Sequence, residues 1–164
     1  MDMNLKQQVL DLMTANRRIS EGHQYTLPSP DSYPYQWLWD SCFHAIILSH
    51  FDTTDAKKEL LSLTKAQFKN GMIPHMIYWE KPKNVHNFPK IHWGLRKTST
   101  LTQPPMIAYA VWQIFKKDNE KEFLKNLTEK GEIQASLLTK EPPMQAKIEN
   151  LPLLRWRASL AIQH

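Results

Sequence analysis

Apolar residues recur at helical spacing along most of the first 117 residues of the chain. This pattern predicts helices over 4–17, 36–50, 53–69 and 102–117. The second of these is apolar on nearly every side, which is typical of a buried helix, whereas charged positions along the third indicate an outer, solvated helix. No stretch alternates with the period of a strand, so the sequence predicts an all-α fold.

The links between these helices predict where their ends meet. A short link at 51–53 makes the second and third helices antiparallel neighbours of similar length. The third helix therefore returns to the level at which the second begins. The loop that follows it and the start of the fourth helix are expected at this same end. Three polar side chains then converge there: Asp40, His75 and Gln103.

Aromatic residues gather near these polar positions. The chain has 6 Trp, 5 Tyr and 6 Phe, many of them between positions 25 and 43 or between 78 and 93. Sugar hydroxyls need paired donors and acceptors, while the apolar faces of a sugar ring pack on flat aromatic surfaces. Because residues two apart on a helix diverge, we assign Trp39 to the site and Trp37 to packing. The combination predicts sugar recognition.

Length, cysteine content and charge narrow the class of protein further. A chain of 164 residues with one cysteine can bury a sizeable core but has neither a disulfide framework nor a cysteine zinc cluster. Its histidines lack the spacing of metal ligands, so we expect no metal and no cofactor. The lysines and arginines between 81 and 97, with no acid among them, could account for the net charge of +5. Such a run is most often solvated, and contact with an anionic substrate is the alternative.

The N-terminal residues show neither the cationic segment nor the apolar run of a signal peptide. No apolar run in the chain has the length that spans a bilayer. We therefore expect a cytoplasmic protein with no membrane partner, and the sequence leaves its oligomeric state open.

Three motifs follow one another along the chain: Tyr33-Pro34-Tyr35-Gln36-Trp37-Leu38-Trp39-Asp40-Ser41-Cys42-Phe43, Gly71-Met72-Ile73-Pro74-His75 and Thr102-Gln103-Pro104-Pro105. In this order they resemble the (α/α)6-barrel glycoside hydrolases of family sixty-three, in the branch of mannosylglycerate and glucosylglycerate hydrolases. The resemblance covers 1–125 and implies a partial barrel of inner and outer antiparallel helices. It implies that Asp40 binds sugar hydroxyls, and it gives substrate contacts to Tyr33, Trp39, His75 and Gln103.

The resemblance also implies what this sequence lacks. These enzymes invert configuration with one carboxylic acid and one carboxylate on opposite faces of the sugar. The motifs that carry this pair in the family are not found in the chain, so no catalytic residue is assigned. We expect the N-terminal, sugar-binding portion of an α-glycosidase for glucosylglycerate, mannosylglycerate or a similar small carbohydrate, inactive on its own. The tail at 126–164 does not resemble the family, which predicts a truncated or frameshifted reading frame; a compact homologue is the alternative.

Two other functions stay open at this point. A basic loop with aromatic residues that stack on bases would suit a nucleic-acid-binding module, although the sequence holds no recognised binding motif and we expect no nucleic-acid partner. A non-functional remnant that exposes its inner helices is the second alternative.

Overall fold

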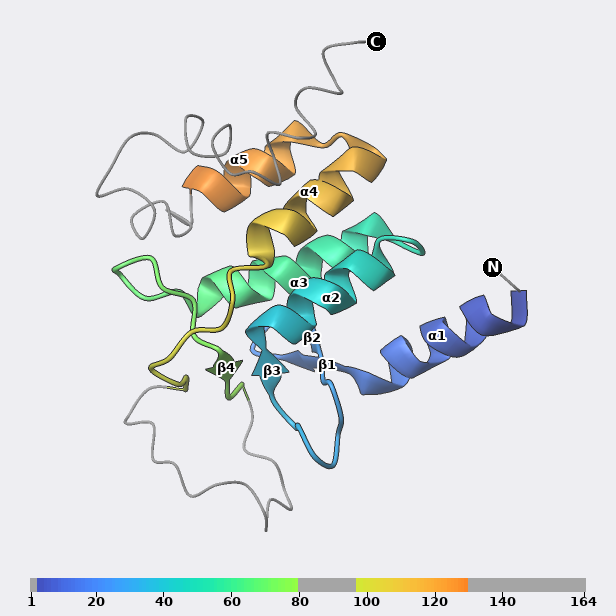
Figure 1. Cartoon of the computed structure of the whole chain (residues 1–164), viewed down its shortest axis with the longest axis horizontal. Coiled ribbons are helices and arrows are strands. Elements are labelled where there is room, and N and C mark those ends of the chain that lie inside the picture. Colours follow the sequence, from blue (N-terminus) through green and yellow to red (C-terminus); the bar gives the residue numbers. More distant parts are fainter. Residues whose placement is uncertain (1–2, 80–96, 130–164) are drawn as a thin grey trace.

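The computed structural model describes residues 3–79 and 97–129 (Figure 1). Within these ranges lie five helices and two short pairs of strands. In chain order they are α1 (Met3–Asn16), β1 (Arg17–Ser20), β2 (His23–Thr26), β3 (Gln36–Trp37), α2 (Leu38–Leu48), α3 (Thr53–Lys65), β4 (Met76–Ile77), α4 (Ile107–Asp118) and α5 (Lys121–Glu129). The basic run at 81–97, except Lys97, and most of the tail lie outside the described residues.

Helices α2, α3 and α4 form the centre of the molecule. A tight turn joins α2 to α3 as antiparallel neighbours, and α4 packs against both of them (Figure 1). The predicted antiparallel pair is therefore confirmed. Helix α5 folds back on α4 and also contacts α3. The apolar core between these helices consists mainly of Leu38, Cys42, Ala45, Leu48, Leu60, Leu63, Ile107, Ala110, Ile114, Phe123 and Leu127.

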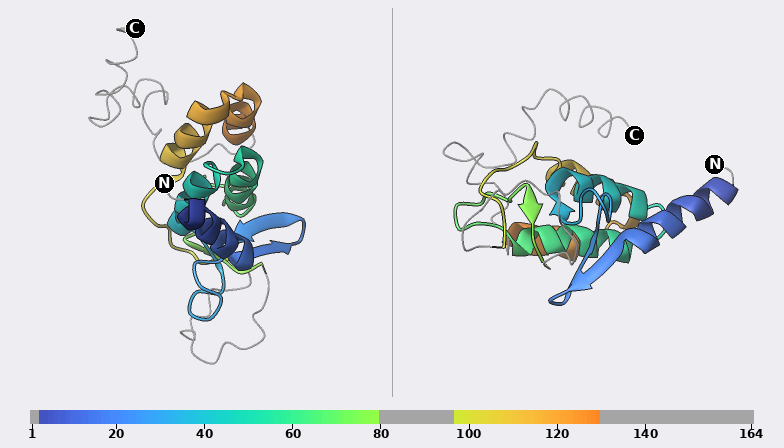
Figure 2. Two further views of the ribbon diagram at one scale, coloured as in Figure 1. Left: turned by 90° about the vertical axis from the view of Figure 1, so that its right-hand side faces the viewer. Right: turned by 90° about the horizontal axis from the view of Figure 1, so that it is seen from below.

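The hairpin of β1 and β2 follows α1, which runs out from the centre (Figure 2). Arg17 pairs with Thr26 and Ser20 pairs with His23 across this antiparallel hairpin. None of the helices within 3–79 and 97–129 is long and apolar enough to cross a membrane.

The all-α prediction is wrong at these strands. Besides the hairpin, β3 pairs with β4 in an antiparallel ladder. The strands are two to four residues long, too short for an alternation of apolar and polar positions to show in the sequence. The fold is therefore helix-rich with a few short strands.

Several helix boundaries also differ from the sequence prediction, and the structure gives a reason for three of them. Helix α2 begins two residues late because Gln36 and Trp37 are paired as β3. Helix α3 ends at Lys65, because the chain turns after it and the Phe68 N–H bonds to the Met72 carbonyl at 2.9 Å. Helix α4 begins only at Ile107, so the proline pair precedes it instead of forming its first turn.

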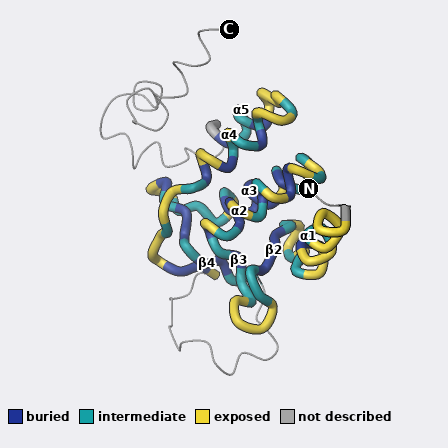
Figure 3. Tube along the Cα trace, turned by 45° about the vertical axis from the view of Figure 1, so that its right-hand side comes forward, coloured by how far each residue is buried: buried dark blue, intermediate teal, exposed yellow. Residues whose placement is uncertain are grey.

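One face of the central helices is uncovered in the described part of the chain (Figure 3). Trp39, Phe43 and Ile47 lie four residues apart along α2 and are 42%, 46% and 37% exposed. Tyr109 and Trp112 of α4, the helix beside α2, are exposed as well. The prediction that the second helix is buried on nearly every side is therefore wrong for this face.

Candidate functional site

The predicted site residues lie where three segments meet at the N-terminal end of α2. The Leu38 N–H donates to the His75 carbonyl at 3.0 Å, and the His75 N–H donates to the Leu101 carbonyl at 2.7 Å. The segment after β3, the loop before β4 and the segment before α4 are thus hydrogen-bonded side by side. These bonds place the backbone of His75 and of Leu101 at the end of α2 whose first turn includes Asp40.

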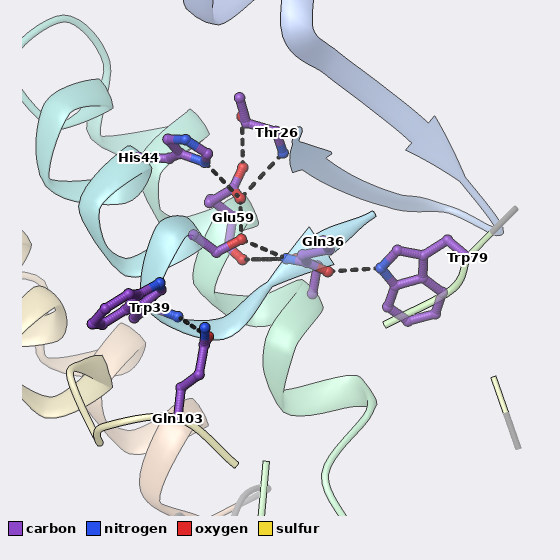
Figure 4. A network of polar contacts seen from close by, with 9 residues as sticks. Thr26, Gln36, Trp39, His44, Glu59, Trp79 and Gln103 are labelled. Atoms are coloured by element: carbon purple, nitrogen blue, oxygen red, sulfur yellow. Dashed lines mark hydrogen bonds and ion pairs between the residues drawn. The ribbon is translucent and has the colours of Figure 1, made fainter. Parts of the chain in front are cut away.

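Gln103 closes the N-terminus of α2. Its Oε1 accepts the Trp39 N–H at 3.1 Å, a group in the first turn that has no partner within the helix (Figure 4). Trp37, at the N-cap position, makes no side-chain cap. Gln103 therefore takes the role of a capping residue from a distant part of the chain, which leaves its amide N–H groups as donors.

The His75 imidazole is held by an aromatic ring and a hydroxyl. Its ring is edge-on to the Trp37 indole at 5.4 Å between centroids, and Trp37 in turn contacts Tyr33 at 5.6 Å. Ser99 Oγ lies 2.6 Å from His75 Nδ1. Burial lowers the pKa of His75, against a hydrogen bond with the Leu101 backbone that raises it. Trp37, which the sequence assigned to packing, packs directly against His75 of the site, while Tyr33 is exposed.

Asp40 lies in the first turn of α2, next to Trp39. The residue is partly buried, and this burial raises the pKa of its carboxyl group. Hydrogen bonds with its own backbone and with the Trp39 side chain act in the opposite direction. A carboxylate near the exposed amides of a helix N-terminus is stabilised there, and its oxygens can accept hydrogen bonds from hydroxyl groups.

A buried polar network beneath the site was missed by the sequence analysis (Figure 4). Gln36 is fully buried, and its Oε1 accepts the indole N–H of Trp79 at 2.7 Å. Its Nε2 donates to Ser62 Oγ at 2.6 Å and to Ser41 Oγ at 3.1 Å. This one side chain therefore connects β3 with α2, α3 and the segment after β4.

Glu59 of α3 is the carboxylate at the base of this network. It is fully buried and accepts the Thr26 N–H at 3.1 Å, the Thr26 hydroxyl at 2.8 Å and the Ser41 hydroxyl at 2.5 Å. Burial raises the pKa of Glu59 to about 7 against these hydrogen bonds. Because no part of Glu59 reaches the surface, it fastens β2 to α2 and α3 and cannot meet a substrate.

His44 of α2 lies beside Glu59, with 3.9 Å between His44 Nδ1 and Glu59 Oε1. Burial lowers the pKa of His44 to about 4, against a hydrogen bond with the Thr26 backbone. His44 is therefore a neutral core residue at pH 7. Within the described residues no three His, Cys, Asp or Glu side chains are grouped as metal ligands would be.

Comparison with protein families shows that the chain is part of a glycoside hydrolase domain. Residues 33–141 match the family model of the mannosylglycerate hydrolase MGH1-like glycoside hydrolase domain. Since this match takes in most of the chain, the chain belongs to that family. The assignment gives no support to the nucleic-acid-binding alternative.

Relatives of the chain include enzymes that differ in their sugar. It is 36% identical over 104 residues to a mannosylglycerate hydrolase of Thermus thermophilus, covering 60% of this chain and 25% of the relative. It is also 36% identical over 102 residues to a glucosylglycerate hydrolase of Mycolicibacterium hassiacum, covering 54% of this chain and 22% of that protein. The chain thus spans about a quarter of the length of these relatives.

The fold is shared with a solved structure of this family. A crystal structure of the family sixty-three mannosylglycerate hydrolase of Thermus thermophilus, in complex with Tris and D-glycerate, superposes with a TM-score of 0.66. Its sequence is 34% identical, and the match covers 77% of this chain and 30% of the other.

Proposed function

We propose that this chain forms the N-terminal, sugar-binding portion of an inverting α-glycosidase that acts on glucosylglycerate, mannosylglycerate or a similar small glycoside. The observation that carries the proposal is the pair of hydrogen bonds that join His75 and Gln103 to the start of α2, the helix whose first turn includes Asp40. The same three positions belong to motifs that occur in the order of the family. Relatives that hydrolyse mannosylglycerate and glucosylglycerate support the choice of substrate class.

The helix arrangement supports a partial (α/α)6 barrel, with α2 and α4 as inner helices and α3 and α5 as outer ones. Both α2 and α4 begin at the site, because Gln103 lies just before α4 and bonds to the start of α2. A short link joins α2 to α3 and another joins α4 to α5, so each inner helix is followed by an outer one. The exposed apolar face made of Trp39, Phe43, Ile47, Tyr109 and Trp112 belongs to the two helices proposed as inner, as expected of a face that further helices of a barrel would cover.

The site chemistry suits the holding of a sugar more than the breaking of a bond. Asp40 supplies acceptors for hydroxyl groups, Gln103 supplies amide donors, and Trp39 supplies an exposed aromatic surface. An inverting glycosidase needs two carboxyl groups with a water between one of them and the sugar. Among the residues that the structure describes, Asp40 supplies the carboxylate of this site, and Glu59 is fully buried in the core. The chain by itself is therefore expected to bind without turnover.

Calorimetric titration of the purified chain with glucosylglycerate, mannosylglycerate and trehalose tests the proposal. We expect weak binding to at least one of the two glycerate glycosides, no release of free hexose, and at least about tenfold weaker binding by Asp40→Asn, because a hydrogen bond to a charged group is lost. Asp31→Asn, which changes an exposed acid of the same charge, is the matched control.

Two results would contradict this function. Hexose release that Asp40→Asn abolishes would show a complete, compact enzyme in which Asp40 is a catalyst. A folded chain that binds none of the three glycosides, with the variant and the control indistinguishable, would remove the sugar-binding role.

A further inference from the structure

Ser99 places a buried hydroxyl group next to the site, and this residue is not part of the three family motifs. Its side chain is 0% exposed. Its backbone N–H donates to the Met76 carbonyl at 3.0 Å, which fixes the residue beside β4. Its Oγ accepts the Met76 N–H at 3.3 Å. Two hydrogen bonds to the backbone of Met76, one to its carbonyl and one from its N–H, therefore fix the position of the Ser99 hydroxyl.

The one proton of the Ser99 hydroxyl has two acceptors within reach. His75 Nδ1 is 2.6 Å from Ser99 Oγ, whereas the Leu101 carbonyl oxygen is 3.4 Å away. The shorter contact has the length of a strong hydrogen bond, and the longer one is at the limit of bonding. A proton donated to Nδ1 requires that this nitrogen carry a lone pair, so a neutral imidazole must then carry its hydrogen on Nε2.

We propose that Ser99 is a positioning residue that holds His75 in the tautomer with hydrogen on Nε2, so that His75 acts as a hydrogen-bond donor to a sugar hydroxyl. The use of that donor rests on the function proposed above, whereas the tautomer itself does not. The Trp37 indole, edge-on to the imidazole at 5.4 Å, adds a contact that restricts rotation of the ring. Ser99 thus sets which end of a hydroxyl dipole His75 recognises.

The Leu101 carbonyl explains why the serine is needed. This oxygen already accepts the His75 backbone N–H at 2.7 Å, and it lies close enough to the imidazole to hydrogen-bond with it. Without the Ser99 hydroxyl, a hydrogen on Nδ1 would bond to this carbonyl, and Nε2 would become an acceptor. Burial also lowers the pKa of His75, which favours the neutral ring in which the choice of tautomer matters.

Imidazole tautomers are read directly from long-range proton–nitrogen NMR spectra of the nitrogen-labelled chain, without any sugar. The chain has 7 histidines, and the His75 signals are those that His75→Gln removes. We expect the pattern of hydrogen on Nε2 in the parent chain. We expect the pattern of hydrogen on Nδ1 in Ser99→Ala, and the parent pattern again in Ser99→Thr, which restores a hydroxyl.

Hydrogen on Nδ1 in the parent chain would overturn the inference, as would an unchanged tautomer in a folded Ser99→Ala chain. Thr100→Ala, at the exposed neighbouring position, is the matched control and should leave His75 as it is. If Ser99→Ala fails to fold, the parent chain and Ser99→Thr decide the question, because both must show hydrogen on Nε2.

Titration with glucosylglycerate separates this inference from the proposed function. Because the variant Ser99→Ala loses the His75 Nε2–H donor, its affinity for glucosylglycerate should be about 3- to 10-fold lower than that of the parent chain. The affinity of Ser99→Thr should be close to that of the parent chain. Absence of binding by the parent chain, together with the expected tautomer, would refute the proposed function and leave the role of Ser99 toward His75 in place. Equal affinities of the parent chain and Ser99→Ala, despite different tautomers, would refute the donor role.

Discussion

Two titratable side chains in the core, Glu59 and His44, respond to pH in opposite directions. Burial raises the pKa of Glu59 from 4.5 to about 7, so the folded state binds more protons than the unfolded state between these values. Its contribution to stability is therefore fully present below about 4.5 and is lost as the pH rises through 7. Burial lowers the pKa of His44 from 6.5 to about 4, so stability from His44 is present above 6.5 and is lost as the pH falls toward 4.

The two changes of stability with pH partly cancel between about pH 4.5 and 6.5. Replacing Glu59 or His44 removes one of the two contributions and leaves the other to be measured. With Glu59→Gln the chain should lose stability as the pH falls from 6.5 to 4, because the opposing Glu59 slope is removed and the lowered pKa values of His44 and His75 act in the same direction. With His44→Gln it should lose stability as the pH rises from 4.5 to 7. Urea denaturation at pH 4.5, 5.5, 6.5 and 7.5 measures both profiles. Parallel profiles for the two variants would show that burial does not shift these groups as described.

The convergence of Asp40, His75 and Gln103 could be predicted from the sequence, because it follows from helix lengths and short links. Glu59 and Ser99 could not be predicted. Glu59 stands in a charged stretch that is typical of a solvated helix, and it is buried because β2 and α2 both pack over its carboxylate. Ser99 acquires its role from its place beside β4, and no local pattern indicates a two-residue strand.

At the scale of single elements, the β1–β2 hairpin depends on its two-residue turn. Glu21 and Gly22 both have positive φ, at 51° and 77°, as the tight turn between antiparallel strands requires. Glycine adopts this conformation without penalty, whereas other residues strain the backbone. Nothing lies within 4 Å of a Cβ atom added at Gly22, so backbone strain alone decides the effect of a substitution there.

Gly22→Ala should therefore destabilise the chain by about 1 kcal/mol, without change in the core. Glu21→Asn should have the opposite sign, because asparagine tolerates this conformation better than glutamate does. The ion pair of Glu21 with Lys97 that this variant loses is exposed and contributes little. Denaturant midpoints of the two variants against the parent chain measure the effect. A neutral Gly22→Ala would mean that the turn does not hold this geometry in solution.

Lys57 fastens α3 to the turn between α4 and α5. Its ammonium pairs with Asp118 and Glu120 and lies over the Phe123 ring at 5.5 Å from the centroid. Burial opposes the charge of Lys57, but the hydrogen bonds with both carboxylates raise its pKa overall. One side chain thus makes contacts with two carboxylates and a ring across three elements.

Lys57→Met should destabilise the chain by about 1 kcal/mol, and the difference should shrink at high salt because part of it is electrostatic. Lys58→Met is the matched control: it changes the next residue, whose partner Asp55 lies on the same helix and whose side chain is 50% exposed. We expect that variant to stay close to the parent chain. Equal losses for the two variants in urea denaturation, at low and at high salt, would contradict the role of Lys57 in joining the elements.

At the scale of the whole molecule, the central helices were predicted from their apolar spacing, but the extent of their burial was not. Helical spacing shows which positions are apolar, and it does not show which neighbours are present to cover them. In α2 the side that includes Leu38, Cys42 and Ala45 is buried against α3 and α4. The side that includes Trp39 and Phe43 is apolar in equal measure and remains exposed.

An exposed aromatic and aliphatic face of this kind favours association or the binding of hydrophobic dyes. We therefore expect the purified chain to self-associate with rising concentration and to bind the dye ANS. Replacing both Phe43 and Trp112 by lysine should reduce both effects, because each removes an exposed ring from the face and adds a charge. Helix content should stay unchanged, since these side chains are 46% and 43% exposed and contribute only part of their surface to packing.

Leu12→Lys is the control for this pair. Leu12 is 61% exposed and belongs to α1, not to α2 or α4. It adds one positive charge to the chain where the double variant adds two, so a general effect of net charge on solubility would appear in the control as well, at a smaller size. Sedimentation over a range of concentrations, with ANS fluorescence, distinguishes the two cases. A reduction by Phe43→Lys/Trp112→Lys alone assigns the association to the inner helices. A monomeric parent chain without dye binding would mean that this face is covered in solution, and that the helices proposed as inner do not lack neighbours.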